Sequence, residues 1–238
     1  MSKIGIISGS GAEEIIFAKE FKAVKFNTKY DAVMIKEGWV EGKSVVFINR
    51  HGPTYYPPHV INSHGNIQAM KQKEVKRIIA TAAVGSMNPR LKPGDFVLLS
   101  DFIDFTSARI GYFDPTNFTD VSFPYDEGLR LKIKQAAARL KIKIHPAAVY
   151  VCTEGPRFES KAEIKMYRKL GGDVVGMTQV PEVVLAAEAC IPYAVIGVVT
   201  NYAAGINRQR ISADEVARKM KEKSRLLSQL LLQAVKAI

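Results

Sequence analysis

Apolar runs long enough for one β-strand recur along this 238-residue sequence, and they limit the folds open to it. Several are almost continuous β-branched residues, a pattern typical of strands that are buried on both faces of a sheet. The runs cover residues 3–8, 44–49, 77–84, 95–103, 147–153, 173–178 and 193–201. A sheet of such strands needs a layer of helices on each face.

Helical patterns lie between these runs, over residues 60–73, 126–141, 161–170 and 213–236 and along PEVVLAAEA from Pro181. Ser160 with Glu163, and Ser212 with Glu215, fit capping boxes, and Pro181 occupies a favourable first-turn position. The alternation predicts an α/β fold: one domain over residues 1–238, with a mixed, mostly parallel sheet flanked by helices. Residues 104–124 lack periodicity, as functional or interfacial loops often do.

Composition and the ends of the chain indicate an ordinary globular protein of the cytoplasm. Hydrophobic residues make up 47% of the chain, and no apolar run reaches the length of a membrane span. The N-terminus carries no cleavage pattern of a signal peptide. Cys152 and Cys190 lie in apolar stretches without metal-ligand spacing, so we expect buried free thiols and no bound metal.

The formal charge of +11 admits two interpretations. A basic surface can bind nucleic acid, or it can be a lysine-rich exterior in contact with water. Here the basic residues are scattered, and they are densest on the last predicted helix. Because no RNA-binding motif or zinc finger accompanies them, we expect no nucleic-acid partner. The lack of an apolar run of membrane-span length predicts that there is no membrane partner either.

Glycine and small polar residues follow the predicted strands. The segments are SGSG (8–11), NRHG (49–52), AAVGS (82–86), CTEGPRFES (152–160), GMTQVPE (176–182) and TNYAAG (200–205). In open α/β sheets, ligands bind beyond the carboxyl ends of the strands. Backbone amides gathered in such turns suit an anion.

In this order, the six segments resemble the trimeric purine nucleoside phosphorylase family, in particular its methylthioadenosine and methylthioinosine phosphorylases. The resemblance runs from about residue 4 to about residue 220. It implies a single-domain α/β fold around a mixed sheet that partly closes into a barrel. It also implies a homotrimer or a dimer of trimers, and no cofactor, with inorganic phosphate as co-substrate.

The resemblance assigns phosphate binding to Ser10, Arg50, His51, the Ala83 amide and Thr178. A phosphate dianion needs amides, hydroxyls and a guanidinium that can hold two oxygens. Each residue also has an ordinary structural interpretation: a turn hydroxyl for Ser10, a surface arginine for Arg50, a core histidine for His51 and a local backbone contact for Thr178. Arg50 follows a buried strand, where its charge must find a partner.

The resemblance places the purine on Asn201, Glu159 and Phe158. An asparagine amide can accept from a protonated purine N7 and donate to O6, while a carboxylate suits the N1–H of hypoxanthine or guanine. Family members that act on adenine nucleosides carry Ser and Asp at the positions of Glu159 and Asn201, and the 6-oxopurine members carry Glu and Asn. Asn201 could instead only turn the chain, and Phe158 could be a core aromatic.

The remaining site residues follow from the resemblance. Met177 is similar to the residue that contacts ribose, with a core methionine as the alternative. Ala213 and Val216 resemble the small apolar lining of the pocket for a 5′-methylthio group. Phe118 resembles an aromatic side chain that a neighbouring subunit contributes, which would make the oligomer necessary for a complete site.

These residues predict phosphorolysis of 6-oxopurine nucleosides, with Asn201, Glu159 and His51 as the catalytic residues. The products are a free purine base and ribose 1-phosphate or its methylthio analogue. Phosphorolysis of 5′-methylthioadenosine is the nearest alternative, and a hydrolytic nucleosidase is more distant. A basic nucleic-acid-binding protein and a non-catalytic nucleoside sensor are alternatives from other classes.

Overall fold

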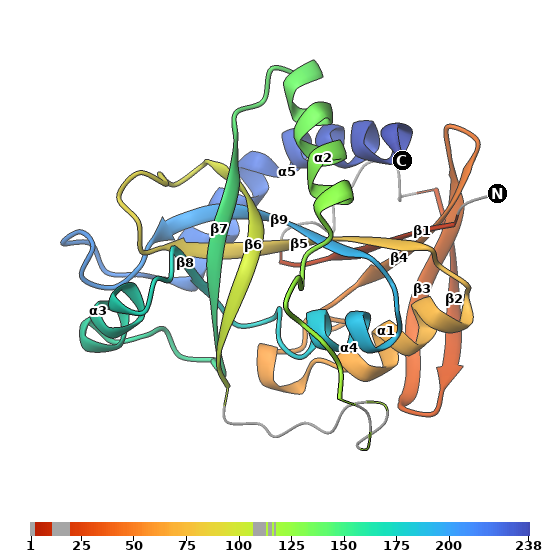
Figure 1. The fold of residues 1–238 in the computed structure, drawn as a ribbon, viewed down its shortest axis with the longest axis horizontal. Helices are drawn as coiled ribbons and strands as arrows, with labels where there is room; N and C mark the ends of the chain where they lie inside the picture. The colour runs from red at the N-terminus through yellow and green to blue at the C-terminus, as the bar shows by residue number, and fades with distance from the viewer. Residues whose placement is uncertain (1–2, 11–19, 107–112, 114–115, 117) are drawn as a thin grey trace.

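In the computed structural model, nine strands form one sheet within the part of the chain that the structure describes, residues 3–10, 20–106, 113, 116 and 118–238 (Figure 1). Their order is β2-β3-β4-β1-β5-β8-β7-β6-β9. The strands are β1 (Ile4–Ser8), β2 (Lys22–Thr28), β3 (Asp31–Val40), β4 (Lys43–Asn49), β5 (Arg77–Ser86), β6 (Phe96–Phe105), β7 (Ile144–Thr153), β8 (Val174–Gly176) and β9 (Tyr193–Tyr202).

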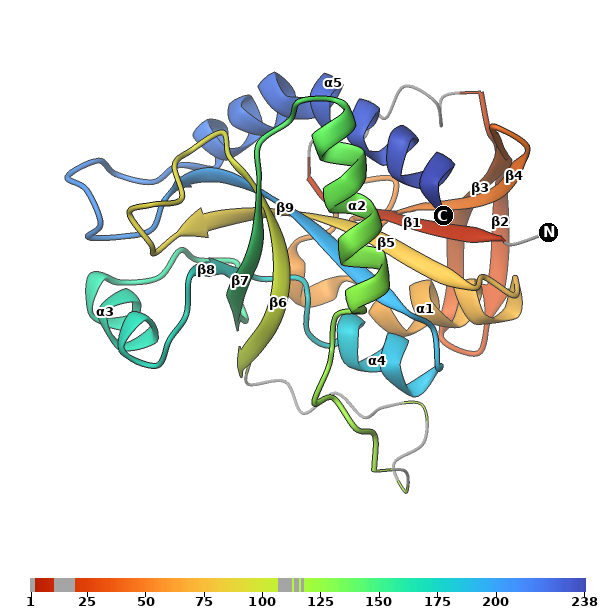
Figure 2. The same cartoon turned by 45° about the horizontal axis from the view of Figure 1, so that its top comes forward.

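Helices cover both faces of this sheet, as Figure 2 shows. The helices are α1 (Ser63–Gln72), α2 (Glu127–Arg139), α3 (Lys161–Lys169), α4 (Glu182–Glu188) and α5 (Ala213–Ala237). α2 and α5 pack on one face in an apolar cluster that includes Ile133 and Leu227. α1 and α4 lie on the opposite face, around Ile67 and Leu185. The predicted α/β architecture with helices on both faces is therefore confirmed.

The sheet closes on itself at one end, as expected from the resemblance. β5 pairs with β8 and also with β9, so that β5, β8, β7, β6 and β9 form a closed ring. Parallel pairs join β1 to β4 and β5, β5 to β9, and β7 to β6 and β8, while β2–β3, β3–β4, β5–β8 and β6–β9 are antiparallel. The sheet of the described residues is thus mixed, with five of its nine pairings parallel, and partly a barrel.

The hairpin of β2 and β3 was not predicted. β2 alternates exposed and half-buried residues, and β3 mixes buried with exposed ones, so neither forms a continuous apolar run. These strands form the edge of the sheet beyond β4, where one face meets solvent. The rule that found buried strands does not detect such a pair.

Several predicted boundaries change in the structure. The expected helix at 60–73 begins only at Ser63, after a 3₁₀ turn at Pro58–Val60, and the expected strand at 173–178 is confined to Val174–Gly176. Pro181 is the N-cap of α4 and not its first helical residue. Ser160 and Glu163 form the predicted capping box of α3, and Ser212 caps α5 by accepting from the Glu215 amide.

Two further expectations have outcomes in the structure. Cys152 is a buried free thiol as expected. Cys190 is also a free thiol, but the prediction that it is buried was wrong, because it is exposed just after α4. None of the helices in the described ranges is long and apolar enough to cross a membrane. Of the segment 104–124 that was expected to be a loop, residues 104–105 belong to β6, and residues 107–112, 114–115 and 117 lie outside the described residues.

The topology brings the glycine-containing segments together. β1 runs parallel to β4 with Ser8 opposite Asn49, so residues 9–10 and 50–52 leave the sheet side by side. β5 and β9 are the next parallel pair, and they end together at Ser86 and Tyr202. The carboxyl ends of four neighbouring strands therefore surround one region.

Candidate active site

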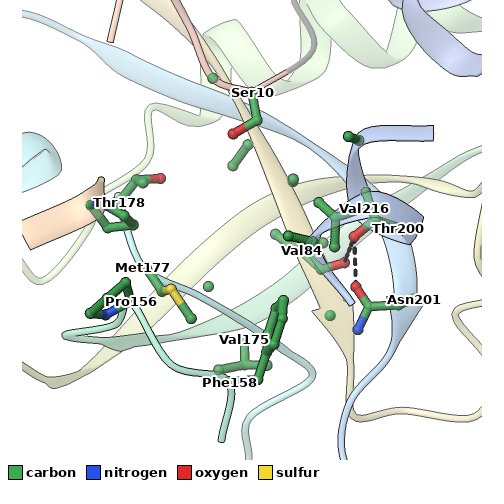
Figure 3. A pocket seen from close by; sticks show the side chains of 18 of the residues that line it. Ser10, Val84, Pro156, Phe158, Val175, Met177, Thr178, Thr200, Asn201 and Val216 are labelled. Atoms are coloured by element: carbon green, nitrogen blue, oxygen red, sulfur yellow. Dashed lines mark hydrogen bonds between the residues drawn. The ribbon is translucent and has the colours of Figure 1, made fainter. Parts of the chain in front are cut away.

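A cavity of about 570 Å³ lies at these strand ends, and eleven of the twelve predicted site residues line it. Figure 3 shows Ser10 and Thr178 toward one end of the cavity and Phe158 and Asn201 toward the other. The eleven predicted residues that line the cavity are Ser10, Arg50, His51, Ala83, Phe158, Glu159, Met177, Thr178, Asn201, Ala213 and Val216. The twelfth, Phe118, is fully exposed and lies outside the cavity lining of its own chain.

Arg50 is almost completely buried at the end of β4, and its partner is a residue that the sequence reasoning missed. Nε and Nη2 donate to the two carboxylate oxygens of Glu182 at 2.7 and 2.8 Å, and Nη1 donates to the carbonyl of Thr81 at 2.7 Å. We expected the guanidinium to use its paired N–H groups on phosphate. These contacts engage three of the five N–H groups of a guanidinium, which leaves two for an anion in the cavity.

The ion pair keeps Arg50 charged in an apolar interior. Burial alone would lower the pKa of Arg50, but the charge of Glu182 and its hydrogen bonds raise it above the ordinary value. Gly9 packs over this arrangement, because a Cβ there would lie 2.9 Å from the Thr81 carbonyl and 3.0 Å from Nη1. Glycine at position 9 therefore lets the first loop approach the guanidinium.

Ser10, His51 and Tyr55 form a hydrogen-bonded chain at the same end. His51 Nδ1 lies 2.8 Å from the carbonyl of Tyr56, which can only accept, so Nδ1 carries a hydrogen. Burial lowers the pKa of His51 and the charge of Arg50 lowers it further, which favours the neutral ring. Nε2 then accepts from Ser10 Oγ at 3.2 Å, and Ser10 in turn accepts from the Tyr55 hydroxyl.

Asn201 stands near the end of β9 with its amide held from two sides. Thr200 Oγ1 donates to Oδ1 at 2.7 Å, and Nδ2 donates to the carbonyl of Tyr202 at 3.0 Å (Figure 3 shows the first contact). If the Asn201 amide were flipped, Oδ1 would face the Tyr202 carbonyl, and two hydrogen-bond acceptors would oppose each other. One acceptor position on Oδ1 and one N–H of Nδ2 stay available to a ligand.

Glu159 lines the cavity, with 8% of its surface exposed. Thr153 Oγ1, at the end of β7, donates to Oε1 at 2.7 Å. Burial raises the pKa of Glu159 above its ordinary value, and the Thr153 hydrogen bond opposes this shift. The carboxylate presents its second oxygen as an acceptor in a largely water-excluded position.

The predicted ribose and 5′ residues also line the cavity. Phe158 is 37% exposed, which excludes the core-aromatic interpretation. Figure 3 shows Met177 between the two ends of the cavity. Ala213 and Val216 of α5 line it together with Ile211, Ala217 and Lys221, so the lining that follows β9 is apolar except for Lys221.

The residues that sequence reasoning missed support the predicted ones. Thr153 and Thr200 orient Glu159 and Asn201, and Glu182 holds Arg50. All three lie within the segments that the sequence had already singled out, CTEGPRFES, TNYAAG and GMTQVPE. Their signal was membership of those segments, but their partners became visible only in three dimensions.

Comparisons with known proteins indicate one protein family. The model of the phosphorylase superfamily matches residues 3–236. A probable 6-oxopurine nucleoside phosphorylase of Moorella thermoacetica is 45% identical over 99% of this chain and 93% of its own length. A probable S-methyl-5′-thioinosine phosphorylase of Methanopyrus kandleri is 45% identical over 91% of this chain and 85% of its own.

A solved structure shares the fold over nearly the whole chain. The methylthioadenosine phosphorylase of Schistosoma mansoni in complex with adenine has a TM-score of 0.95 and 30% sequence identity. The match covers 99% of this chain and 91% of that one. With the sequence match over residues 3–236, this shows that the chain belongs to the phosphorylase superfamily.

Proposed function

We propose that this protein cleaves 6-oxopurine nucleosides with inorganic phosphate and releases the free base and a ribose 1-phosphate. The observation that carries the proposal is one cavity lined by Arg50, Ser10, His51, Thr178, Glu159 and Asn201, with Ser10 and Thr178 toward one end and Asn201 toward the other. The two substrates of phosphorolysis need one site for an anion and one for a purine. The relatives named 6-oxopurine nucleoside phosphorylase support this assignment.

In the proposed mechanism, the bond between sugar and base stretches first and positive charge develops on the ribose. The phosphate attacks the anomeric carbon from the face opposite the base, and its negative charge stabilises the developing cation. Asn201 Oδ1 accepts from the protonated N7 of the departing base, and Nδ2 donates to O6. Both contacts strengthen as the base gains electron density, which is the property that accelerates a reaction.

The held amide of Asn201 favours an oxopurine. A 6-oxopurine protonated at N7 presents one donor and one acceptor on this edge, which match Oδ1 and Nδ2. Adenine presents two donors there, and the Tyr202 carbonyl opposes the amide turn that would meet the second. Glu159 adds to the preference, because its carboxylate accepts from the N1–H of an oxopurine but faces a lone pair in adenine.

The 5′ side and the assembly extend the proposal. The small apolar lining around Ala213 and Val216 suits a 5′-methylthio group, and a relative named for methylthioinosine supports this. We also propose a homotrimer or a dimer of trimers, and a cytoplasmic reaction without a metal or organic cofactor. Two free cysteines suit a reducing compartment.

The substrate panel tests the function directly. We expect purine release from inosine, guanosine and 5′-methylthioinosine only when phosphate is present, with methylthioinosine at least as good as inosine. Chromatographic assay of the free base, with and without phosphate, measures this. Phosphate-independent release would identify a hydrolase, and equal efficiency on methylthioadenosine would support the 6-aminopurine alternative.

Asn201 and Glu159 should set the base preference. Two mismatched buried groups cost about 1–3 kcal/mol each, so the wild type should favour inosine over adenosine by about a hundredfold or more in kcat/KM. Asn201→Asp combined with Glu159→Ser should lower this ratio strongly. Asn207→Asp is the matched control, because the Asn207 amide donates to the nearby Gln209 in the exposed segment after β9. An unchanged ratio in the double variant contradicts the assignment.

The base preference should also depend on pH through Glu159. The pKa of this carboxyl is raised by burial, so protonation begins above the ordinary range of a glutamate. As pH falls through that pKa, the carboxylate loses its charge and gains a proton that can meet adenine N1. The inosine to adenosine ratio of kcat/KM should therefore fall with pH, and ionisation of phosphate cancels from this ratio. In Glu159→Gln the ratio should be constant, and a constant ratio in the wild type would refute the role of Glu159.

Phe118 should act in the site of a neighbouring subunit. It is fully exposed in the single chain, as is expected of a side chain that a partner covers. Phe118→Ala should raise the KM for inosine about tenfold, because an aromatic contact with the nucleoside is lost. Phe123→Ala, of similar exposure, is the control, and sedimentation checks the assembly of each variant. A fully active monomer would remove this proposal.

A further inference from the structure

A buried hydrogen-bond network connects Arg50 and Thr178, two residues of the proposed phosphate site, through side chains that do not line the cavity. Glu182 holds Arg50 by two hydrogen bonds, and the Tyr193 hydroxyl lies within hydrogen-bond distance of Glu182 Oε1. The same hydroxyl lies 2.8 Å from Gln179 Oε1, and Gln179 Nε2 donates to Thr178 Oγ1 at 3.4 Å. A phenol carries one hydrogen, so Tyr193 donates to either Glu182 or Gln179 at any one time. We call Glu182, Tyr193 and Gln179 the Glu182 network.

The Glu182 network is deeply buried and connects distant parts of the chain. Glu182 and Gln179 have no exposed surface, and Tyr193 has 2%. Glu182 begins α4, Gln179 precedes that helix and Tyr193 begins β9, while Arg50 follows β4. None of the three side chains lines the cavity. Among the described residues that line the cavity, their side chains hydrogen-bond to Arg50 and Thr178.

The network fixes the direction in which Arg50 can act. A long side chain has many rotamers, and two hydrogen bonds to one carboxylate select a single plane for the guanidinium. The Thr81 carbonyl occupies a third N–H, so the two remaining N–H groups have fixed positions. Tyr193 stays protonated, because burial and the nearby Glu182 charge raise its pKa well above the ordinary value, and so it can keep donating to Glu182.

We propose that the Glu182 network positions Arg50 and Thr178 for phosphate, and that Tyr193 is a positioning residue of the reaction although it does not touch substrate. The inference rests on the proposed function, because it assumes that Arg50 and Thr178 bind phosphate. It goes beyond that function by assigning a role to three side chains outside the cavity. In the proposed purine site, Thr153 and Thr200 hold Glu159 and Asn201 independently of this network. Loss of the network should therefore weaken phosphate binding and leave purine binding unchanged.

Tyr193→Phe is the sharpest test of this role. Removal of Glu182 would leave the Arg50 charge unpaired in the interior, which is strongly destabilising, and would test folding more than catalysis. Tyr193→Phe removes one donor and leaves the ion pair intact. We expect the KM for phosphate to rise about tenfold, the effect of one hydrogen bond, with the KM for inosine unchanged.

Tyr125→Phe is the matched control. The ring of Tyr125 lies 6.2 Å from that of Tyr193, and its buried hydroxyl has no hydrogen-bond partner in the described part of the chain. This variant should keep the wild-type KM for both substrates. Gln179→Met breaks the other arm of the network at nearly constant volume and should raise the KM for phosphate selectively. Melting curves of all three variants establish that each is folded at the assay temperature.

The outcomes separate the two proposals. A wild-type enzyme that needs no phosphate would overturn the proposed function. A phosphate-dependent wild type with equal phosphate KM values in Tyr193→Phe and Tyr125→Phe would overturn the positioning role and leave the function standing. A parallel rise in both KM values would also contradict it, because a general loss of structure does not distinguish between the two substrates. Titration of inorganic phosphate by calorimetry gives the same comparison at equilibrium.

Discussion

The buried ion pair between Arg50 and Glu182 is the interaction on which the proposed phosphate site depends. A guanidinium at the end of a buried strand would be prohibitively costly without a partner, and Glu182 supplies one that also fixes its orientation. The pair joins the residue after β4 to the first residue of α4. The Gly9 backbone, the Thr81 carbonyl and Tyr193 are arranged around this pair.

The proposed purine site follows the same principle with neutral partners. Thr200 and the Tyr202 carbonyl hold Asn201, and Thr153 holds Glu159, so each group that would meet the base is fixed before a ligand arrives. Fixed donors and acceptors need no reorganisation during the reaction, which makes them effective in catalysis. They also make the site selective, because a base with the wrong pattern leaves them unpaired. Selectivity for 6-oxopurines and catalysis would then have one structural cause.

Sequence reasoning predicted the parts of this structure that depend on local pattern or on family motifs. Buried strands, the Ser160 capping box and the grouping of motif segments at strand ends all have a signature along the chain. The β2–β3 hairpin has none, because its edge position replaces a continuous apolar run with mixed burial. The partner of Arg50 could not be predicted either, since Glu182 lies 132 residues away and only the packing of α4 against the strand ends brings them together. The exposure of Cys190 likewise depends on where α4 stops.

A crystal structure with phosphate and hypoxanthine bound together would test the central claim most directly, because the account assigns each end of the cavity to one of them. Phosphate should lie within hydrogen-bond distance of the two free N–H groups of Arg50, of Ser10 and of Thr178, while the Arg50–Glu182 pair stays intact. Hypoxanthine should place N7 against Asn201 Oδ1, O6 against Nδ2 and N1 against Glu159. Phosphate bound elsewhere, or a base held with the Asn201 amide turned away from Thr200, would contradict the account.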